Sequence, residues 1–149
     1  MTTALENPRL MTQRIEDVRR RAQRIVQDAN VLLEGHFDFG NGYHGRVYLN
    51  PHMLFARPAT IWQLAQDLLD ILPYDLTAQV QAVVGPATGG ALLAHTLAGL
   101  LDGRRSLDHP PCLFAPVDFD AEQGLRLRST YRGVLAGKQV LVADDVRNT

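Results

Sequence analysis

The feature that most constrains the fold is a short apolar run followed by a glycine-rich turn and a long apolar stretch. Residues 82–84 read AVV, residues 85–90 read GPATGG, and residues 91–101 are apolar at nearly every position. A run that is apolar on both sides is typical of a strand buried inside a parallel sheet. The segment therefore predicts a buried strand, a tight loop and a buried helix, as in α/β folds.

Other segments continue this alternation of helices and strands. Apolar residues spaced by three and four over 12–33 predict a helix that ends at Gly35, and residues 37–39 and 47–49 predict two short strands around a glycine turn. A second helix is expected over 61–72, beginning near Pro58 or Thr60 and ending at Pro73.

Two further apolar runs complete the predicted sheet. Residues 112–115 and 139–143 predict strands, and the Leu-Arg alternation at 125–128, inside the polar segment 116–137, suggests one edge hairpin. The chain is therefore expected to form a mainly parallel α/β sheet.

Composition limits the size and the partners of the protein. A chain of 149 residues with 46% hydrophobic content fits one domain with a single core. The formal charge of -1 gives no global field for nucleic acid or an anionic membrane, and the single cysteine, Cys112, excludes an internal disulfide. Residues 1–21 are polar and carry neither a secretory signal nor a membrane span, so a cytoplasmic location is expected.

The loop at residues 85–90 is the first candidate binding element. Ligands of open parallel sheets bind beyond the carboxyl ends of the strands. Three glycines in this loop allow close approach of the backbone, and the amides at the start of the following helix favour an anion. The residues alone leave a second interpretation open, in which the loop is a tight turn and Thr88 caps the helix.

The second candidate element is the acidic pair after the last apolar run, where residues 140–143 lead directly into Asp144 and Asp145. Adjacent carboxylates are costly to crowd without a partner. They suit a ligand with vicinal hydroxyls or a divalent metal ion. The alternative is that Asp145 caps a following helix.

Three segments together resemble a known family. Residues 140–149 are similar to the phosphoribosyl-pyrophosphate motif of type I phosphoribosyltransferases, with four hydrophobic residues, two acids, a valine and a turn. Residues 84–91 resemble the pyrophosphate loop of orotate phosphoribosyltransferases, and residues 35–37, 41–42 and 48–50 resemble their N-terminal hood. The resemblance covers 31–149. It implies one domain, 1–149, with the Rossmann-like parallel sheet of the type I phosphoribosyltransferase fold, a helix and hood over 12–52, a core over 58–149, and a missing C-terminal part.

The resemblance also implies an activity, namely the transfer of ribose 5-phosphate from phosphoribosyl pyrophosphate to a nucleobase. Orotate is the expected base, giving orotidine 5′-monophosphate in pyrimidine biosynthesis. Mg²⁺ is expected to act through the pyrophosphate and the ribose hydroxyls. No protein residue is expected to bind the ion directly, but Asp144 or Asp145 would contact it through water. The expected assembly is a homodimer with small-molecule substrates and no nucleic-acid or membrane partner.

The same resemblance assigns roles to eight residues. Asp144 and Asp145 would bind the ribose hydroxyls and stabilise developing positive charge, and Asn148 and Thr149 would hold the 5-phosphate. Thr88, Gly89 and Gly90 would hold pyrophosphate, and Tyr48 would lie near the base.

Three departures from the family pattern leave alternatives open. Gly89 stands where relatives often have lysine, and residues 116–132, which correspond to a mobile loop of the relatives, contain Arg126, Arg128 and Arg132 but no lysine. Losing one donor at a charged transition state can cost about 2.7 to 4 kcal/mol. The sequence also ends inside the motif, so a fragment of a longer protein is expected. A non-catalytic regulator that binds phosphoribosyl pyrophosphate or nucleotide, and a phosphoribosyltransferase for another base, both remain alternatives.

Overall fold

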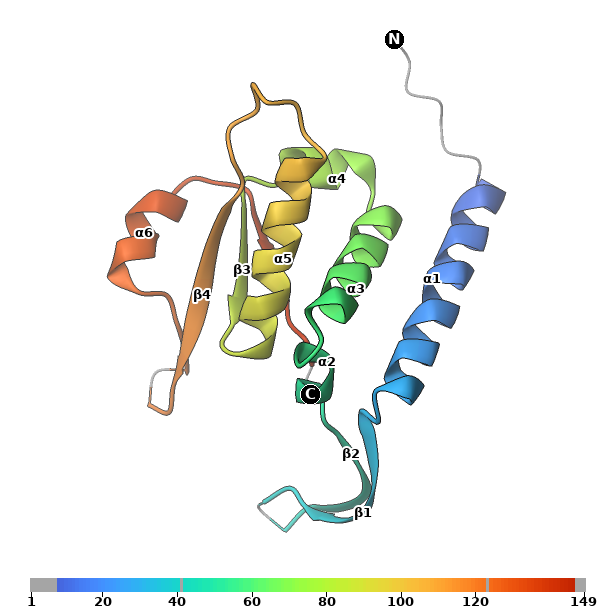
Figure 1. Ribbon diagram of the computed structural model, residues 1–149. Coiled ribbons are helices and arrows are strands. Elements are labelled where there is room, and N and C mark those ends of the chain that lie inside the picture. The colour runs from blue at the N-terminus through green and yellow to red at the C-terminus, as the bar shows by residue number, and fades with distance from the viewer. Residues whose placement is uncertain (1–7, 41, 123, 147–149) are drawn as a thin grey trace. The chain divides into compact units, whose positions relative to one another are not determined.

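The computed structural model describes residues 8–40, 42–122 and 124–146 (Figure 1). It divides into two compact units, Met1–Leu54 and Phe55–Thr149, whose relative position is not determined. Each unit is therefore described by itself, and the single-domain organisation stays a prediction. In the part of the chain that is described, no helix is both long enough and apolar enough to cross a membrane.

The first unit holds one long helix and a hairpin. Helix α1 spans Pro8–Asp28, strand β1 spans Leu32–Asp38 and strand β2 spans His44–Leu49. The short helix α2, His52–Phe55, follows, and its last residue, Phe55, belongs to the second unit. The two strands pair antiparallel, from Leu32 opposite Leu49 to Asp38 opposite His44. The hairpin predicted around the glycine turn is therefore confirmed, although β1 begins five residues earlier than residue 37.

The end of the first helix was predicted wrongly. The helix was expected to reach Gly35, but it ends at Asp28, and Leu32 and Leu33 belong to β1. Asn30 takes a left-handed conformation with φ 50°. Its N–H donates to the Gln27 carbonyl at 3.3 Å, and the Val31 N–H donates to the Val26 carbonyl at 3.4 Å. This pair of bonds is the Schellman motif, which satisfies the last helical carbonyls and turns the chain away.

Replacement of Asn30 by alanine should therefore destabilise the end of α1. A side chain that tolerates left-handed backbone poorly costs about 1 to 2 kcal/mol at such a position, whereas Asn30→Gly removes that cost and serves as the matched control. We expect Asn30→Ala to lower the urea midpoint of the helical circular dichroism signal and Asn30→Gly to preserve it. Equal midpoints for the two variants would contradict this account of the helix end.

The second unit is a four-stranded sheet with helices on both faces (Figure 1). Its sheet order is β5-β4-β3-β6, in which β3 lies parallel to β4 and to β6 and β5 is an antiparallel edge. The parallel α/β sheet expected from the sequence is confirmed. The elements are α3 (Pro58–Ile71), α4 (Tyr74–Gln79), β3 (Ala82–Pro86), α5 (Gly89–Gly103), β4 (Leu113–Asp120), β5 (Gly124–Arg126), α6 (Ser129–Leu135) and β6 (Val140–Val142).

Strand β3 is the centre of the core. Its side chains alternate between the two faces, as they do in any strand. Val83, fully buried, packs with residues of α3 and α5, whereas Ala82 and Val84 pack with Leu135 of α6. Because helices cover both faces of the sheet, the side chains on both faces of β3 are apolar, and its sequence is a continuous apolar run. This run is the signal from which the strand was predicted.

The elements that the sequence did not predict are short. Helices α2, α4 and α6 have four, six and seven residues. None completes the several turns over which a hydrophobic period can be read. Strand β4 also extends beyond the predicted Ala115 to Asp120, because its second half pairs with β5, with Asp118 opposite Arg126. That pairing confirms the edge hairpin expected near residues 125–128.

The only cysteine of the chain is buried in the core of this unit. Cys112 is 9% exposed, and its N–H donates to a carboxylate oxygen of Asp102 at 2.6 Å. Burial raises the pKa of the Cys112 thiol, and the charge of Arg105 opposes the shift. A raised thiol pKa means less thiolate at a given pH, and the thiolate is the reactive form.

We therefore expect Cys112 to react slowly with Ellman's reagent at pH 8 in the folded protein and rapidly in concentrated denaturant. The measurement is the release of the coloured thiolate with time, with free cysteine at the same pH as the reference. Equal rates with and without denaturant would show that the thiol is not protected by the fold.

Candidate functional site

The two candidate binding elements lie at the same edge of the sheet. Strands β3 and β6 run parallel with Val84 opposite Val142, and the Ala143 N–H donates to the Val84 carbonyl at 2.9 Å. Parallel strands have their carboxyl ends at one edge. The pairing therefore brings the loop at residues 85–90 beside Asp144 and Asp145, and we call these eight residues the cradle.

The loop and the acidic tip are packed so closely that glycine is required. A Cβ atom on Gly85 would overlap the Gly90 carbonyl and lie 2.7 Å from the Ala143 oxygen. A Cβ atom on Gly90 would lie 2.9 Å from Oδ1 of Asp144. Real Cβ atoms essentially never approach other atoms within 3.0 Å. The glycines therefore allow the backbone of one strand end to touch the other.

The carboxylates of the acidic pair lie against the first turn of α5. Asp144 is exposed and accepts a hydrogen bond from the Asp145 N–H at 2.9 Å, and Asp145 is half-buried. A Cβ atom on Gly89 would overlap the Asp145 carboxylate, so this carboxylate lies directly beside the start of the helix. The amides and the dipole at a helix N-terminus favour negative charge, which offsets part of the repulsion within the pair.

Thr88 does not cap the helix with its side chain. It occupies the N-cap position of α5 with φ −101° and ψ −43°, and its hydroxyl makes no capping hydrogen bond. Thr88 therefore lies at the N-cap position that the alternative interpretation expects, but its side chain does not cap the helix. Thr88 is exposed at the start of the helix, next to the buried Gly89 and Gly90. For Asp145, no helix follows within the described residues, and the capping alternative is not tested there.

The described structure does not test the roles predicted for three further residues. Asn148 and Thr149 lie outside the described residues. Tyr48 belongs to β2 in the first unit, where its ring centroid is 5.5 Å from that of Phe37 and 6.5 Å from that of Phe39. Since the units are not placed relative to one another, the role of Tyr48 stays a prediction.

Phe55 is a cradle neighbour that the sequence did not reveal. It ends the short helix α2, and its ring occupies the space beside Gly89, where a Cβ atom would lie 2.6 Å from Cε2 of the ring. A single aromatic residue before the predicted helix carries no periodic signal. The ring and the Asp145 carboxylate together leave no room for a side chain at position 89, which gives a structural reason for glycine there.

Two of the three arginines in the segment 116–132 bind within that segment. The guanidinium of Arg128 donates to both carboxylate oxygens of Asp118, at 2.6 and 3.2 Å, and holds the pKa of that carboxyl below its usual value. Arg132 donates to the Leu127 carbonyl at 3.0 Å. These bonds stabilise the end of the β4–β5 ribbon, and they occupy cations that the predicted mobile loop would otherwise offer to a ligand.

Comparison with solved structures identifies the fold of this chain. The orotate phosphoribosyltransferase of Aeropyrum pernix matches with a TM-score of 0.53 and 22% identity, over 80% of this chain and 61% of that chain. The enzyme of Francisella tularensis matches with a TM-score of 0.51 and 21% identity, over 85% and 57%. The chain therefore has the type I phosphoribosyltransferase fold.

Curated sequences narrow the likeness to one group. Orotate phosphoribosyltransferase of Erythrobacter litoralis (strain HTCC2594) is 31% identical over 123 residues, covering 81% of this chain and 57% of the relative. That of Thermotoga maritima is 33% identical over 127 residues, covering 84% and 59%. The resemblance to orotate phosphoribosyltransferases predicted from the motifs is confirmed, and the chain spans less than two thirds of these relatives' lengths. No family model matches the chain.

The close packing at Gly89 predicts opposite effects for two glycines of the same helix. Gly89→Ala should destabilise the second unit by about 1 to 3 kcal/mol, because the added methyl overpacks the cradle. Gly99→Ala is the matched control, since a Cβ atom there meets nothing within 4 Å. It should stabilise α5 by about 0.5 to 1 kcal/mol. Denaturant unfolding of both variants checks the pair, and a neutral Gly89→Ala would contradict the packing.

Proposed function

We propose that this protein is a magnesium-dependent phosphoribosyltransferase that transfers ribose 5-phosphate from phosphoribosyl pyrophosphate to orotate. The observation that carries the proposal is the cradle, in which an amide-rich loop and a carboxylate pair meet at the carboxyl ends of β3 and β6. The likeness of this chain to curated orotate phosphoribosyltransferases supports orotate as the base. The reaction and its substrates are proposals for the whole protein.

In the proposed reaction, the bond between C1 of ribose and the pyrophosphate oxygen breaks, and a bond from C1 to a nitrogen of the base forms. The amides of Gly89 and Gly90 at the start of α5 would bind pyrophosphate. Asp144 and Asp145 would accept hydrogen bonds from the ribose hydroxyls, and their charge would stabilise the positive charge that develops on the sugar. Thr88 would add its hydroxyl beside the pyrophosphate.

The acid pair also fits the expected magnesium ion. Among the described residues, no three His, Cys, Asp or Glu side chains gather into a group that could hold a metal. Mg²⁺ rarely uses such protein cages, and instead keeps several waters and binds one or two carboxylates together with substrate phosphates. Asp144, whose carboxylate is exposed, could contact the ion through water. The ion would neutralise charge on the leaving pyrophosphate.

Other parts of the proposal concern residues and partners beyond the cradle. Asn148 and Thr149 would begin the turn that holds the 5-phosphate, and Tyr48 would lie near the base. We propose a homodimer as the assembly, as the family resemblance implies, and a cytoplasmic location.

The acid pair provides the direct test of this function. The full-length protein, incubated with orotate, phosphoribosyl pyrophosphate and Mg²⁺, should convert orotate, measured as a loss of its absorbance, and release pyrophosphate. Asp144→Asn and Asp145→Asn should each lower kcat/KM by about 10² to 10³, the scale of losing one group that stabilises transition-state charge. Asp75→Asn, which removes an acid from the first turn of α4, is the matched control and should leave kcat/KM unchanged. Full activity of both cradle variants would refute the roles assigned to the pair.

A regulator that binds phosphoribosyl pyrophosphate without turnover is the second candidate. Two observations favour it: Gly89 has no room for a lysine, and residues 116–132 contain none. Calorimetry with phosphoribosyl pyrophosphate and Mg²⁺ separates the two functions, because a regulator would bind without pyrophosphate release in the presence of any base. Turnover with a base other than orotate, found in a substrate panel, would indicate a different specificity of the same reaction.

A further inference from the structure

A second pocket lies at the amino ends of the strands that carry the cradle. Gln81 and Gln139 directly precede β3 and β6, Leu113 begins β4, and all three residues line the pocket. The cradle is built from the carboxyl ends of β3 and β6, so the two sites are at opposite ends of these strands. The pocket has a volume of about 590 Å³, within the range of about 300 to 1,000 Å³ typical of small-molecule sites.

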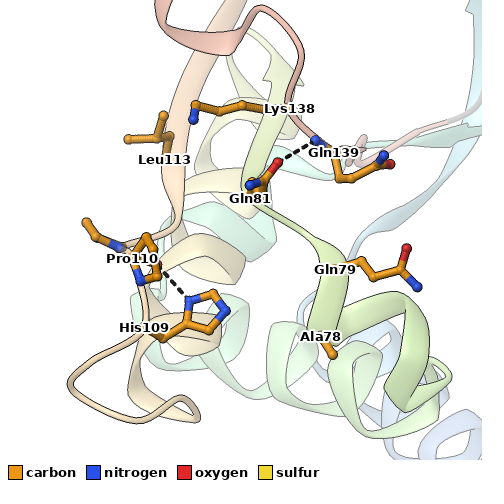
Figure 2. Close-up of a pocket in the computed structure, with 9 residues that line it drawn as sticks. Ala78, Gln79, Gln81, His109, Pro110, Leu113, Lys138 and Gln139 are labelled. Carbon is orange, nitrogen blue, oxygen red and sulfur yellow. Dashed lines mark hydrogen bonds between the residues drawn. The ribbon is translucent and has the colours of Figure 1, made fainter.

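The lining of the pocket combines one cation with several hydrogen-bonding groups. Lys138, the only lysine of the chain, lines it together with His109 and three glutamines, and none of the lining residues carries a carboxylate. Among the described residues, no side chain binds the Lys138 ammonium or the side-chain amides of Gln79 and Gln139. These groups are available to a ligand. Figure 2 shows Lys138 on the side of Leu113, and Gln79 and Gln139 on the other side.

The walls of the pocket are fixed by hydrogen bonds. The guanidinium of Arg105 donates to the Thr77 carbonyl at 2.9 Å and to the Val80 carbonyl, and thereby ties the α5–β4 connection to the end of α4. Oε1 of Gln81 accepts the Gln139 N–H at 3.0 Å, which joins β3 to the chain before β6 (Figure 2). A site whose walls are held before binding loses less entropy when a ligand binds.

The chemistry of the pocket specifies a ligand with two different parts. The ammonium of Lys138 requires an anionic group, since a charge-assisted hydrogen bond is stronger than a neutral one. The free carboxamides, each with a donor and an acceptor, suit the polar edge of a heterocycle. Pro110 and Pro111 supply apolar surface. Nδ1 of His109 faces the Pro110 carbonyl, so Nε2 is the ring nitrogen that can donate a hydrogen bond to a ligand or accept one from it.

We propose that this pocket is a second binding site for a heterocyclic organic anion of mononucleotide size. Lys138 binds the anionic group, and Gln79, Gln139 and His109 bind the heterocycle. The inference depends on the pocket alone and goes beyond the proposed transferase function, because it uses none of the cradle residues.

The single lysine makes the site directly measurable. The rate at which an acylating reagent acetylates Lys138 is measured by peptide mass spectrometry. The measurement is made with and without uridine or adenosine 5′-monophosphate, the ligands that are tested for protection of Lys138. We expect at least one nucleotide to slow acetylation about tenfold, and inorganic phosphate to slow it much less because phosphate cannot reach the glutamines. The protection should persist in Asp144→Asn, since the cradle is at the other edge of the sheet. The amino terminus, labelled in the same samples, is the internal control.

Three outcomes would overturn the proposal: no protection by either nucleotide, equal protection by inorganic phosphate, or loss of protection in Asp144→Asn. Calorimetry with the protecting nucleotide gives the second measurement. Lys138→Gln should weaken binding about tenfold or more, because a hydrogen bond to a charged group is lost. Lys138→Arg, which keeps the charge, should retain binding. Equal affinities of Lys138→Gln and the unaltered chain would also refute the site.

Discussion

The parallel pairing of β3 with β6 is the interaction on which the rest of the structure depends. It places the two strand ends at one edge, and the Ala143 N–H bonded to the Val84 carbonyl fixes their register at the point where the strands stop. If β3 slipped by one residue along its neighbouring strands, the Val83 side chain would turn from the face covered by α3 and α5 to the face covered by α6. The slip would also move the acidic pair away from the start of α5. Core packing and site geometry are therefore determined by the same hydrogen bonds, and neither can change without the other.

The electrostatics of the cradle follow from this closeness. Two carboxylates and the anion that the loop is suited to bind would share the positive end of one helix. A phosphate group that enters must therefore meet the amides while the acids remain nearby, and like charges at such distances repel. A lysine at position 89 of the loop would supply a compensating cation, but Phe55 and Asp145 fill the space beside Gly89. The compensating cation must then come from a metal ion bound with the substrate or from a side chain of another segment. This requirement is common to the enzyme and to the regulator.

The sequence predicted the central elements because their signals are local and strong. Strand β3 is apolar on both faces, α5 is apolar almost all round, and the acids follow β6 directly, so the adjacency of loop and acids could be anticipated from the rule that ligands bind at carboxyl ends. The end of α1 could not be read in the same way. Leu32 and Leu33 continue the helical spacing by coincidence, and only the left-handed backbone of Asn30 ends the helix before them. Phe55 was missed for another reason, since its contact with Gly89 joins residues distant in sequence and has no period.

The two edges of the sheet are connected by very little structure. Strand β6 has three residues and β3 has five, and at a rise of about 3.3 Å per residue these strands are only about 10 to 17 Å long. Gln81 and Gln139, which line the pocket, immediately precede the strands that end in the cradle. A ligand that draws these glutamines together or apart therefore acts on the strand pair that sets the distance between loop and acids. Any such coupling between the sites must be reciprocal, because the two binding free energies are linked. A ligand at the cradle would change the affinity of the pocket by the same factor.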